Sequence, residues 1–421
     1  MSKINKKVLI IGAGAAGLAA GISAAANGAE VCIIEHSEKA GTKLLMTGNG
    51  HCNYTNTDVS PKHYHGDGIF VREVLNNFGY EDCINFFRSL LIMPKIKKYS
   101  YDDTGYVYPW SGEATSVRNA LLEKLNSLNV KLYTNTKPEE IIFSENEGFT
   151  VKTSKGSYKA DSLIVATGSN AYPKTGSDSS FYRFIKDFGH NFYTFMPALS
   201  MIKSNDALLK EIKGVRVEAD VKLMVYSDND MMMYDERGEV QFNENGISGI
   251  PVMQLSRYVP IFLQRRYSLW LTISLLPKLS SDELYELLKD RYKIVKENGY
   301  PEYMMLSGLI PEKLQRALIE ECKIDFELED EYIKELVKNI KELKFEVSKA
   351  PSFDQAQVCS GGVDTFEIDQ LTMESKLVKN LYFVGEVLNI DGNCGGYNLH
   401  FAFATGYIAG RAAAGMENKD K

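Results

Sequence analysis

Three glycines near the N-terminus carry the most recognisable chemistry in the sequence: Gly12, Gly14 and Gly17 form the pattern G-x-G-x-x-G. In this pattern the first glycine allows a tight turn, the second lets a pyrophosphate approach the backbone, and the third lets a helix pack closely on a strand. The N-terminus of that helix offers unpaired N–H groups and a partial positive charge to the phosphates. Glu35 ends the next apolar segment, where a carboxylate accepts hydrogen bonds from both ribose hydroxyls. The pattern therefore predicts a site for the ADP half of NAD or of FAD.

Two later segments favour FAD over NAD. Residues 166–168 (Ala-Thr-Gly) end a buried apolar run, and a second such run at 381–384 leads into Gly-Glu. Flavoproteins of the glutathione-reductase type place an acid after such a strand to bind the ribityl chain, and Glu386 stands here where Asp is more usual. Gly395 and Gly396 precede the last predicted helix, whose N-terminus would stabilise the anionic reduced flavin at its N1/C2=O edge.

The elements that must position these residues follow from the hydrophobic pattern. Lys7–Ile11 and Glu30–Ile34 are predicted strands, and the small residues of 15–27 between them predict a helix. This βαβ unit is typical of a parallel sheet. Residues 139–160 are predicted to form a β-meander, and Ser162–Ala166 a further buried strand.

The pattern changes near residue 191. From about 192 to 275 apolar and polar residues alternate, which predicts a second, β-rich domain. From 280 to about 344 the pattern is helical, and Ser280 with Glu283 forms a capping box at its start. After residue 351 strands return, followed by a final helix.

Composition narrows the class of protein. The chain has 421 residues, which suggests roughly three domains, and 44% of them are hydrophobic, as in globular proteins. Its net charge of −7 argues against nucleic acid as a main partner, because phosphate binding favours a basic surface.

Residues 8–27 resemble a signal peptide, but their glycine pattern favours the βαβ unit, and no other stretch approaches the length of a membrane span. Scattered cysteines without C-x-x-C spacing fit a reducing cytosol, so we expect a cytoplasmic protein with no membrane partner.

Several motifs together resemble one family, the BaiN-like or aminoacetone-oxidase-family FAD-binding proteins of bacteria. The resemblance covers both predicted FAD segments and part of the β-rich domain. The segments that carry it are KLLMTGNGHCNYTN (43–56), GYVYPWSGEA (105–114), ATGSNAYPKTGS (166–177), GEVQFNENGISGIP (238–251), TMESK (372–376) and LYFVGEVLNIDGNCGGYNLHFAFATGYIAG (381–410).

The resemblance implies an α/β fold: a Rossmann-like FAD-binding domain of the glutathione-reductase type, interrupted by a β-rich domain that carries a small helical insert. This agrees with the changes of pattern along the chain. The implied ranges are 1–190 plus 355–421 for the FAD-binding domain, 191–275 plus 346–354 for the β-rich domain, and 276–345 for the helical insert.

The motifs and the resemblance together predict one non-covalent FAD site assembled from both ends of the chain. The loop at 48–50 should approach the flavin, and the start of the last helix should lie by its pyrimidine edge. The predicted FAD-binding residues are Gly12, Ala13, Gly14, Ala16, Gly17, Glu35, His36, Lys43, Gly48, Asn49, Gly50, Cys52, Ala166, Thr167, Gly168, Gly385, Glu386, Gly396, Tyr397, Asn398 and Leu399.

The sequence departs from the family pattern at positions expected near the flavin. His51 and Tyr106 stand where the family usually has Arg, and Asn245 where it has His. Asn389 replaces a usual Asp, and His400 a usual Gln. The substrate is therefore expected to differ from that of other family members.

His51 and His400 are the candidate catalytic residues, because histidine is the usual proton donor near neutral pH. A hydrogen-bonding or packing role for each is the alternative. His63 and His65 lack the acid or cysteine cluster that would complete a metal site, so no metal is predicted. Cysteines 52 and 394 could form a redox pair, but two small buried side chains are the favoured interpretation.

Three functions remain open at this point. The favoured one is a two-electron or hydride transfer through flavin N5 in which NAD(P)H reduces a small unsaturated or carbonyl substrate, such as a steroid enone. No second G-x-G-x-x-G is visible, so NAD(P)H would visit the flavin only transiently. The second is an oxygen-dependent oxidase of an amine of the aminoacetone type. The third is a flavin-dependent RNA modifier or a flavin-bearing binding protein, and the oligomeric state stays unknown.

Overall fold

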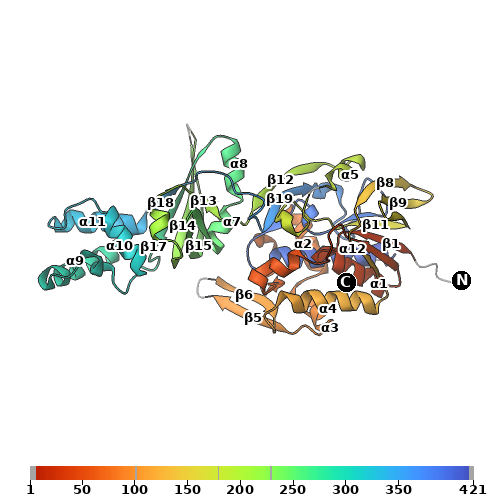
Figure 1. Ribbon diagram of the computed structural model, residues 1–421, viewed down its shortest axis with the longest axis horizontal. Coiled ribbons are helices and arrows are strands. Elements are labelled where there is room, and N and C mark those ends of the chain that lie inside the picture. Colours follow the sequence, from red (N-terminus) through yellow and green to blue (C-terminus); the bar gives the residue numbers. More distant parts are fainter. Residues whose placement is uncertain (1–5, 100–101, 179, 228–229, 417–421) are drawn as a thin grey trace. The chain divides into compact units, whose positions relative to one another are not determined.

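The computed structural model describes residues 6–99, 102–178, 180–227 and 230–416, and the chain divides into two compact units (Figure 1). Unit 1 comprises Met1–Pro197 and Gln357–Lys421, and unit 2 comprises Ala198–Ala356. The FAD-binding domain predicted at 1–190 plus 355–421 lies within unit 1 apart from residues 355 and 356, and its ends, 1–5 and 417–421, are outside the described residues. The predicted β-rich domain and helical insert fall almost entirely in unit 2.

Unit 1 is built on a parallel sheet with the strand order β20-β11-β1-β2-β7, in which every neighbouring pair is parallel. The strand that leads into the glycine-rich turn, β1, is central, and the strand that leads into Glu386, β20, lies at an edge. This confirms the predicted α/β fold with a parallel Rossmann-like sheet. The strands are β1 (Lys7–Ile11), β2 (Glu30–Ile34), β7 (Lys131–Tyr133), β11 (Ser162–Val165) and β20 (Leu381–Phe383).

Helices and short turns complete the parallel layer of unit 1. They are α1 (Ala15–Ala26), α2 (Gly68–Asn77), α3 (Tyr80–Ser89), α4 (Ala114–Ser127), α5 (Tyr182–Asp187) and α12 (Tyr397–Ala413), with the 3₁₀ turns η1 (Lys43–Gly50), η2 (Pro61–His63), η3 (Pro173–Thr175), η5 (Thr365–Glu367) and η6 (Gly385–Val387).

Smaller sheets surround this layer. The predicted meander is present as β8 (Pro138–Ser144), β9 (Gly148–Thr153) and β10 (Gly156–Ala160), and both of its pairings are antiparallel. The others are β3 (Thr55–Asn56) with β6 (Asp102–Pro109) and β5 (Pro94–Tyr99), β21 (Asp391–Gly392) with β4 (Tyr64–His65), and β12 (Phe192–Ala198) with β19 (Val358–Val363).

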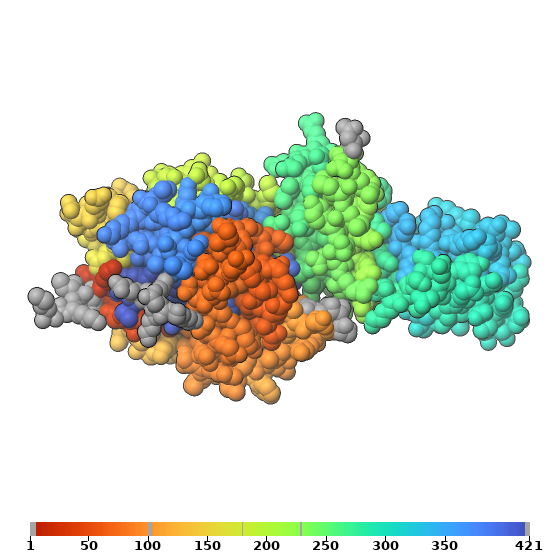
Figure 2. All heavy atoms as spheres, turned by 180° about the vertical axis from the view of Figure 1, so that it is seen from behind, coloured from red at the N-terminus to blue at the C-terminus, as the bar shows by residue number. Residues whose placement is uncertain are grey.

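Helices α1 and α12 pack with their backbones unusually close. A Cβ atom added to Gly406 would lie 2.2 Å from the carbonyl oxygen of Ala16, and one added to Gly410 would lie 2.4 Å from that of Ala20. Both distances are shorter than any side chain tolerates, so α12 requires glycine at both positions. The helix after the glycine-rich turn is thereby joined to the helix at the other end of the sequence. Figure 2 shows segments from about residue 50 onward (orange) next to segments after residue 350 (blue) on one face of unit 1.

Unit 2 contains an antiparallel sheet with the order β13-β16-β15-β14-β17-β18. Its strands are β13 (Ile202–Lys203), β14 (Arg216–Tyr226), β15 (Met231–Asn243), β16 (Gly246–Gly249), β17 (Ser268–Leu275) and β18 (Leu343–Glu346). Its helices are α6 (Leu208–Glu211), α7 (Ile250–Leu255), α8 (Tyr258–Gln264), α9 (Ser281–Asn298), α10 (Glu312–Glu321) and α11 (Glu329–Lys341), with the turn η4 (Glu302–Leu306).

The helices α9 to α11 share one hydrophobic core with this sheet. Leu288 on α9 and Leu336 on α11 belong to the same buried cluster as Leu271 on β17. The predicted capping box is present, since Ser280 Oγ accepts the N–H of Glu283 and Glu283 accepts the N–H of Ser280. The helical insert is therefore packed into the core of unit 2.

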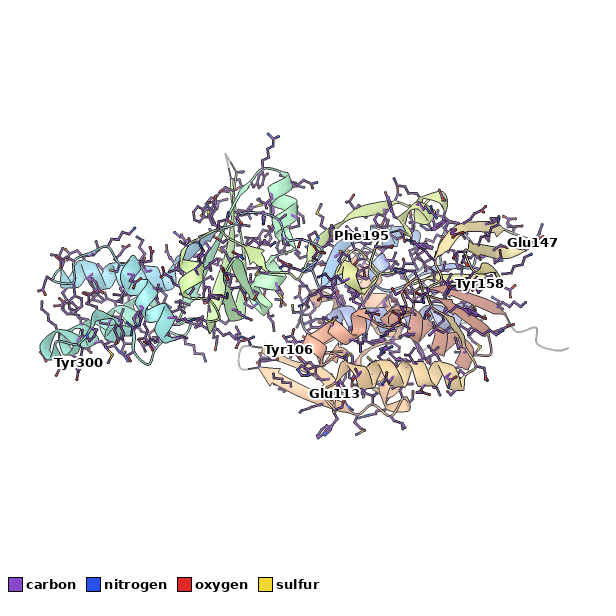
Figure 3. The ribbon with its side chains drawn as sticks, viewed as in Figure 1. Tyr106, Glu113, Glu147, Tyr158, Phe195 and Tyr300 are labelled. Carbon is purple, nitrogen blue, oxygen red and sulfur yellow. The ribbon has the colours of Figure 1, made fainter. Side chains whose placement is uncertain are left out.

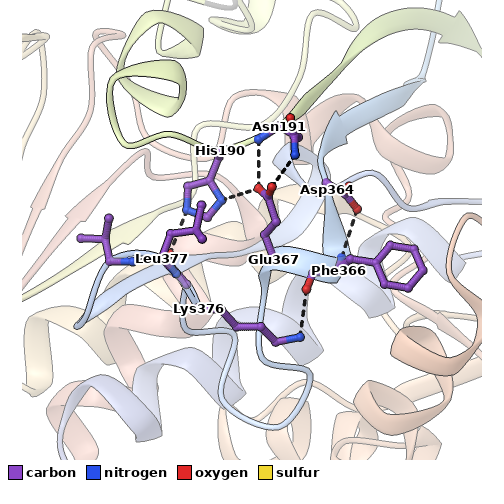
Figure 4. A network of polar contacts seen from close by, with 9 residues as sticks. His190, Asn191, Asp364, Phe366, Glu367, Lys376 and Leu377 are labelled. Atoms are coloured by element: carbon purple, nitrogen blue, oxygen red, sulfur yellow. Dashed lines mark hydrogen bonds and ion pairs between the residues drawn. The ribbon is translucent and has the colours of Figure 1, made fainter.

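A buried polar network fastens β12 to the segment after β19 within unit 1 (Figure 4). His190 Nδ1 lies 2.9 Å from Glu367 Oε2, and its Nε2 lies 2.8 Å from Ser375 Oγ. Glu367 also accepts the backbone N–H of Asn191 at 2.9 Å. Burial lowers the pKa of His190, so the ring is neutral and donates from Nδ1 to the carboxylate. The network lies close to the strands through which the chain leaves and re-enters unit 1.

Residues 8–27, which resemble a signal peptide in the sequence, form β1 and α1 in the core of unit 1. Across the described ranges, no helix is both long enough and apolar enough to cross a membrane.

His400 is a buried residue whose hydrogen bonds connect α12 to two other segments of unit 1. Its side chain is 0% exposed. Nε2 lies 3.1 Å from the carbonyl oxygen of Phe78, so it carries the proton, and Nδ1 accepts the hydroxyl of Thr55 at 2.8 Å. Burial lowers the pKa of His400 to about 4. This geometry contradicts the predicted role of His400 as a proton donor, because no ring nitrogen is left for a substrate.

Replacing His400 with Gln should change how stability depends on pH. An unfolded histidine titrates near pH 6.5, whereas His400 resists protonation down to about pH 4 in the folded chain. The folded wild type should therefore lose up to about 3 kcal/mol relative to His400→Gln as the pH falls from 6.5 to 4. Gln can still donate to Phe78 and accept from Thr55. Urea denaturation of both proteins across this range measures the difference, and parallel stability curves would contradict the assignment.

Candidate FAD site

The three glycines of the turn between β1 and α1 have different roles: two are required by backbone packing, and one faces open space. Gly12 has φ +101°, and an added Cβ would lie 2.4 Å from the carbonyl oxygen of Ala166 at the end of β11. A Cβ on Gly17 would lie 2.0 Å from the carbonyl oxygen of Gly12. The fold itself therefore requires both residues. Gly14 has φ −80°, and an added Cβ would meet no atom within 4 Å, so this position opens onto space beside the helix N-terminus.

Glu35 is fixed beside this turn by backbone groups. Its side chain is almost fully buried; Oε2 accepts the N–H of Ala13 at 2.8 Å and Oε1 accepts the N–H of Ser37 at 2.7 Å. His36 lies next to it, with Nδ1 3.3 Å from Oε1. The carboxylate thus stands at the carboxyl ends of the central strands, where an adenosine ribose binds in this type of fold.

Glu386 is the centre of a second polar cluster. Oε2 lies 2.6 Å from Lys43 Nζ, and Oε1 accepts the hydroxyl of Ser169 at 2.8 Å and the N–H of Cys359 at 3.0 Å. Burial and the neighbouring Glu386 raise the pKa of the Cys359 thiol to about 12. The structure therefore brings together the predicted Lys43 and Glu386, from η1 and η6, and adds Ser169, one residue after the predicted Ala166–Gly168 segment.

The N-terminus of α12 forms the third part of the site. Gly396 has φ +95°, and a Cβ there would lie 2.5 Å from the carbonyl oxygen of Thr55 and 2.8 Å from Asn53 Oδ1. The helix begins at Tyr397 with no side-chain cap. Asn398 does not extend into this space, because its side chain bonds the backbone N–H and carbonyl of Gly392. The backbone N–H groups of the first turn, including that of Leu399, stay as the donors of this helix end.

The loop at 48–51 is exposed, as the prediction of an approach to the flavin requires. Gly48, Asn49 and Gly50 all lie on the surface, and Tyr108 Cε1 lies 3.4 Å from a Cβ position on Gly48. His51 follows, with Nδ1 2.6 Å from the carbonyl oxygen of Gly112. A carbonyl only accepts, so Nδ1 carries a proton and Nε2 is the nitrogen without a bond among the described residues.

Cys52 faces the core and corrects the prediction that it binds the cofactor. Its side chain is fully buried, beside Thr47 and close to Cys83, and burial raises the pKa of its thiol to about 12. Its backbone turns the chain from the loop into β3, and the described cysteines are all free thiols. Across the residues that the structure describes, no group of three or more potential metal ligands comes together.

These parts fit FAD on two observations. The open space at Gly14 and the uncapped start of α1 suit a pyrophosphate, with Glu35 next to them for the ribose. At the other end, Asn53 Oδ1 is a buried acceptor that has no partner among the described residues, and it lies beside the donors of α12. The pyrimidine edge of a flavin presents one N–H between two carbonyl groups, which matches an orphan acceptor next to free donors.

Sequence reasoning missed several residues of this site. Asn53 and Asn56 lie inside the 43–56 motif, where two asparagines that closely follow a glycine-rich loop were a usable sequence signal, and the structure shows that both are buried. Ser169 directly follows the predicted Gly168. Cys359 belongs to the site only through its backbone N–H, and no feature of its local sequence indicates that role.

The two kinds of glycine predict different outcomes for substitution. Gly14→Val fills open space at a φ that valine can adopt, so the chain should fold normally but lose FAD because the pyrophosphate cannot approach. Gly17→Ala places a Cβ against the backbone of the turn and should lower the stability of the protein with or without FAD. Bound flavin measured by absorbance and melting temperature of the apoprotein separate the two effects. A yellow, fully loaded Gly14→Val protein would contradict the placement of the pyrophosphate.

The HI0933-like protein Rossmann domain family matches residues 6–412. The chain is 36% identical over 416 residues to a 3-dehydro-bile acid delta(4,6)-reductase of Clostridium scindens, covering 97% of this chain and 99% of that protein. It is 28% identical over 422 residues to a ribosomal RNA dihydrouridine synthase of Haemophilus influenzae, covering 97% of this chain and 98% of that protein.

Among solved structures, a 3-ketosteroid delta1-dehydrogenase of Sterolibacterium denitrificans shares the fold. Its TM-score is 0.53 at 12% identity, with 97% of this chain and 100% of that chain covered. The chain therefore belongs to the HI0933-like Rossmann family, and it is an FAD-dependent oxidoreductase.

Proposed function

We propose that this enzyme reduces a carbon–carbon double bond conjugated to a carbonyl group in a small molecule of the steroid-enone type, with NAD(P)H as the electron source. One observation carries the proposal: the 36% identity to the Clostridium scindens reductase extends over almost the whole of both chains. The fit of the site to FAD supports it, because a flavin exchanges two electrons with a nicotinamide and with a conjugated double bond.

The chain's own residues bind and orient the cofactor in this proposal. The turn at 12–17 and Glu35 hold the ADP half. Lys43 and Glu386 hold the middle of the cofactor, and the start of α12 with Asn53 holds the pyrimidine edge. The helix end would stabilise negative charge on the reduced ring, which favours uptake of electrons from NAD(P)H.

Reduction of an enone also consumes a proton, and His51 is the proposed donor. It is exposed, it directly follows the flavin-facing loop, and its Nδ1 is held by Gly112. Nε2 carries a proton only in the imidazolium form, so His51 donates from Nε2 and is neutral afterwards. Of the two predicted histidines, His51 alone has a ring nitrogen available, since both nitrogens of His400 are bonded inside unit 1.

Stopped-flow reduction and reoxidation test this function. Under anaerobic conditions NADH or NADPH should bleach the flavin rapidly, and a 3-oxo-4-ene steroid should restore its colour. His51→Gln should slow the reoxidation by the steroid about a hundredfold, within the range of general acid catalysis, and leave the reduction by NAD(P)H unchanged. His65→Gln, a histidine of β4 that is not among the predicted FAD-binding residues, serves as the matched control.

Either of two results would contradict the proposal. One is a flavin that neither nicotinamide nucleotide reduces. The other is reduction by aminoacetone with formation of hydrogen peroxide in air, which would establish the amine oxidase instead.

A ribosomal RNA dihydrouridine synthase is the second candidate, favoured by the 28% identity to the Haemophilus influenzae enzyme over the length of both chains. The two reactions are related, because the C5=C6 bond of uridine is also conjugated to a carbonyl group. The negative net charge of the chain weighs against RNA.

Mass spectrometry of ribosomal RNA distinguishes the two candidates. Unmodified ribosomal RNA incubated with the enzyme and NADPH should gain no dihydrouridine if the substrate is a small enone. A stoichiometric gain at one uridine would replace the small-molecule proposal.

A further inference from the structure

Helix α4 carries an arginine on the face that it buries. The helix begins directly after Glu113, which is labelled in Figure 3, and its buried residues include Ala114, Leu121 and Leu125. Arg118 follows Ala114 by four residues and precedes Leu121 by three, so it belongs to the same face of the helix. Its side chain is half-buried. A charged group at such a position loses part of its hydration, and a partner must compensate for the loss.

The side chain of Arg118 lies against the loop that follows β2. Its Nε donates to the carbonyl oxygen of Ala40 at 2.8 Å, and its Cγ lies 3.1 Å from a Cβ position on Gly41. The N–H of Gly41 in turn donates to the carbonyl oxygen of Ala13 at 2.8 Å. Ala13 stands between the first two glycines of the G-x-G-x-x-G turn. Arg118 is therefore held next to a loop that is itself bonded to the proposed pyrophosphate turn.

The guanidinium group of Arg118 keeps most of its donors. An arginine has five N–H groups, and the bond to Ala40 uses the one on Nε. The terminal nitrogens have no hydrogen-bond partner among the described residues, and no described carboxylate forms an ion pair with the group. The N–H groups of the terminal nitrogens form a rigid planar fork, which matches two oxygens of a phosphate group.

The charge balance at the turn favours a cation at this place. Each phosphate of a diphosphate diester such as FAD carries a negative charge, whereas the N-terminus of α1 offers only about half an elementary charge. Glu35 adds negative charge beside the turn, and its Oε2 already accepts the N–H of Ala13. Lys43 does not supply the missing charge, because its Nζ lies 2.6 Å from Glu386. Arg118 is a cation beside the turn that no described acid neutralises.

We propose that Arg118 binds the diphosphate of FAD through the terminal N–H groups of its guanidinium. The bond from Nε to Ala40 fixes the plane of the fork before the cofactor arrives. Arg118 thereby adds a residue of α4 to a site that the motifs draw from other segments of unit 1. The inference goes beyond the proposed function, because it does not depend on which substrate the enzyme reduces.

Substitution of Arg118 tests the proposal in the full-length holoenzyme. Arg118→Gln should raise the dissociation constant of FAD about tenfold to a hundredfold, the range for hydrogen bonds between charged groups. Arg118→Lys keeps the charge but not the fork, so its constant should lie between those of wild type and Arg118→Gln. Flavin fluorescence during dilution of each holoenzyme measures the constant.

Arg183→Gln is the matched control for the loss of an arginine. Arg183 also donates to a backbone carbonyl, that of Glu139 at 2.8 Å, but it is exposed and lies on α5. Its removal should leave the dissociation constant of FAD at the wild-type value.

Two competitors show which part of FAD the side chain contacts. ADP-ribose contains the diphosphate and adenosine lacks it, and each is used to displace FAD from the holoenzyme. Arg118→Gln should weaken the binding of ADP-ribose as much as that of FAD and leave the dissociation constant of adenosine unchanged. The affinity for FAD should also depend less on ionic strength in this variant, because an attraction between opposite charges has been removed.

Either of two results overturns the proposal. An unchanged affinity of Arg118→Gln for FAD shows that the guanidinium only reaches water. Equal weakening of adenosine and ADP-ribose shows that the side chain contacts the adenosine or only shapes the loop at Ala40, and in the second case the melting temperature of the variant also falls. No turnover is measured, so failure of the proposed reaction and failure of this inference are separate results.

Discussion

The close approach of α1 and α12 is the constraint on which the FAD site depends. Two carbonyl groups of α1 lie where side chains of α12 would otherwise stand, and Gly406 and Gly410 remove the conflict. Because α1 begins at the proposed pyrophosphate turn and α12 begins at the proposed pyrimidine edge, this packing would set the distance between the two ends of a bound FAD. It also explains how the chain can leave unit 1 after β12 and return at β19 without losing the site.

The parts of the site whose contacts lie close together in the sequence were predictable. Gly17 and Glu35 act within one βαβ unit, and their spacing in the sequence indicates where they lie, whereas Gly12 also meets the backbone of Ala166 after β11. The parallel sheet and the meander follow from apolar runs of strand length. The strand order was not predictable, because β20 joins the sheet beside β11 only through contacts between residues far apart in the sequence.

The residues that were missed or misassigned are those whose contacts join segments far apart in the sequence. His400, Cys52 and Asn398 lie in motifs beside the cofactor, yet their side chains bond or pack within unit 1. A motif indicates a place in the fold but does not separate residues that contact a ligand from those that hold the loop in shape. Hydrogen-bond pairing separates them: Asn53 and Cys52 are buried neighbours, and of the two only Asn53 keeps an acceptor without a partner among the described residues.

The names of the two relatives describe reductions of different molecules, a bile acid derivative and a uridine in ribosomal RNA. Both substrates contain a double bond conjugated to a carbonyl group, so one arrangement of flavin and proton donor can serve both. Selection between them must then come from surfaces that touch the rest of the substrate.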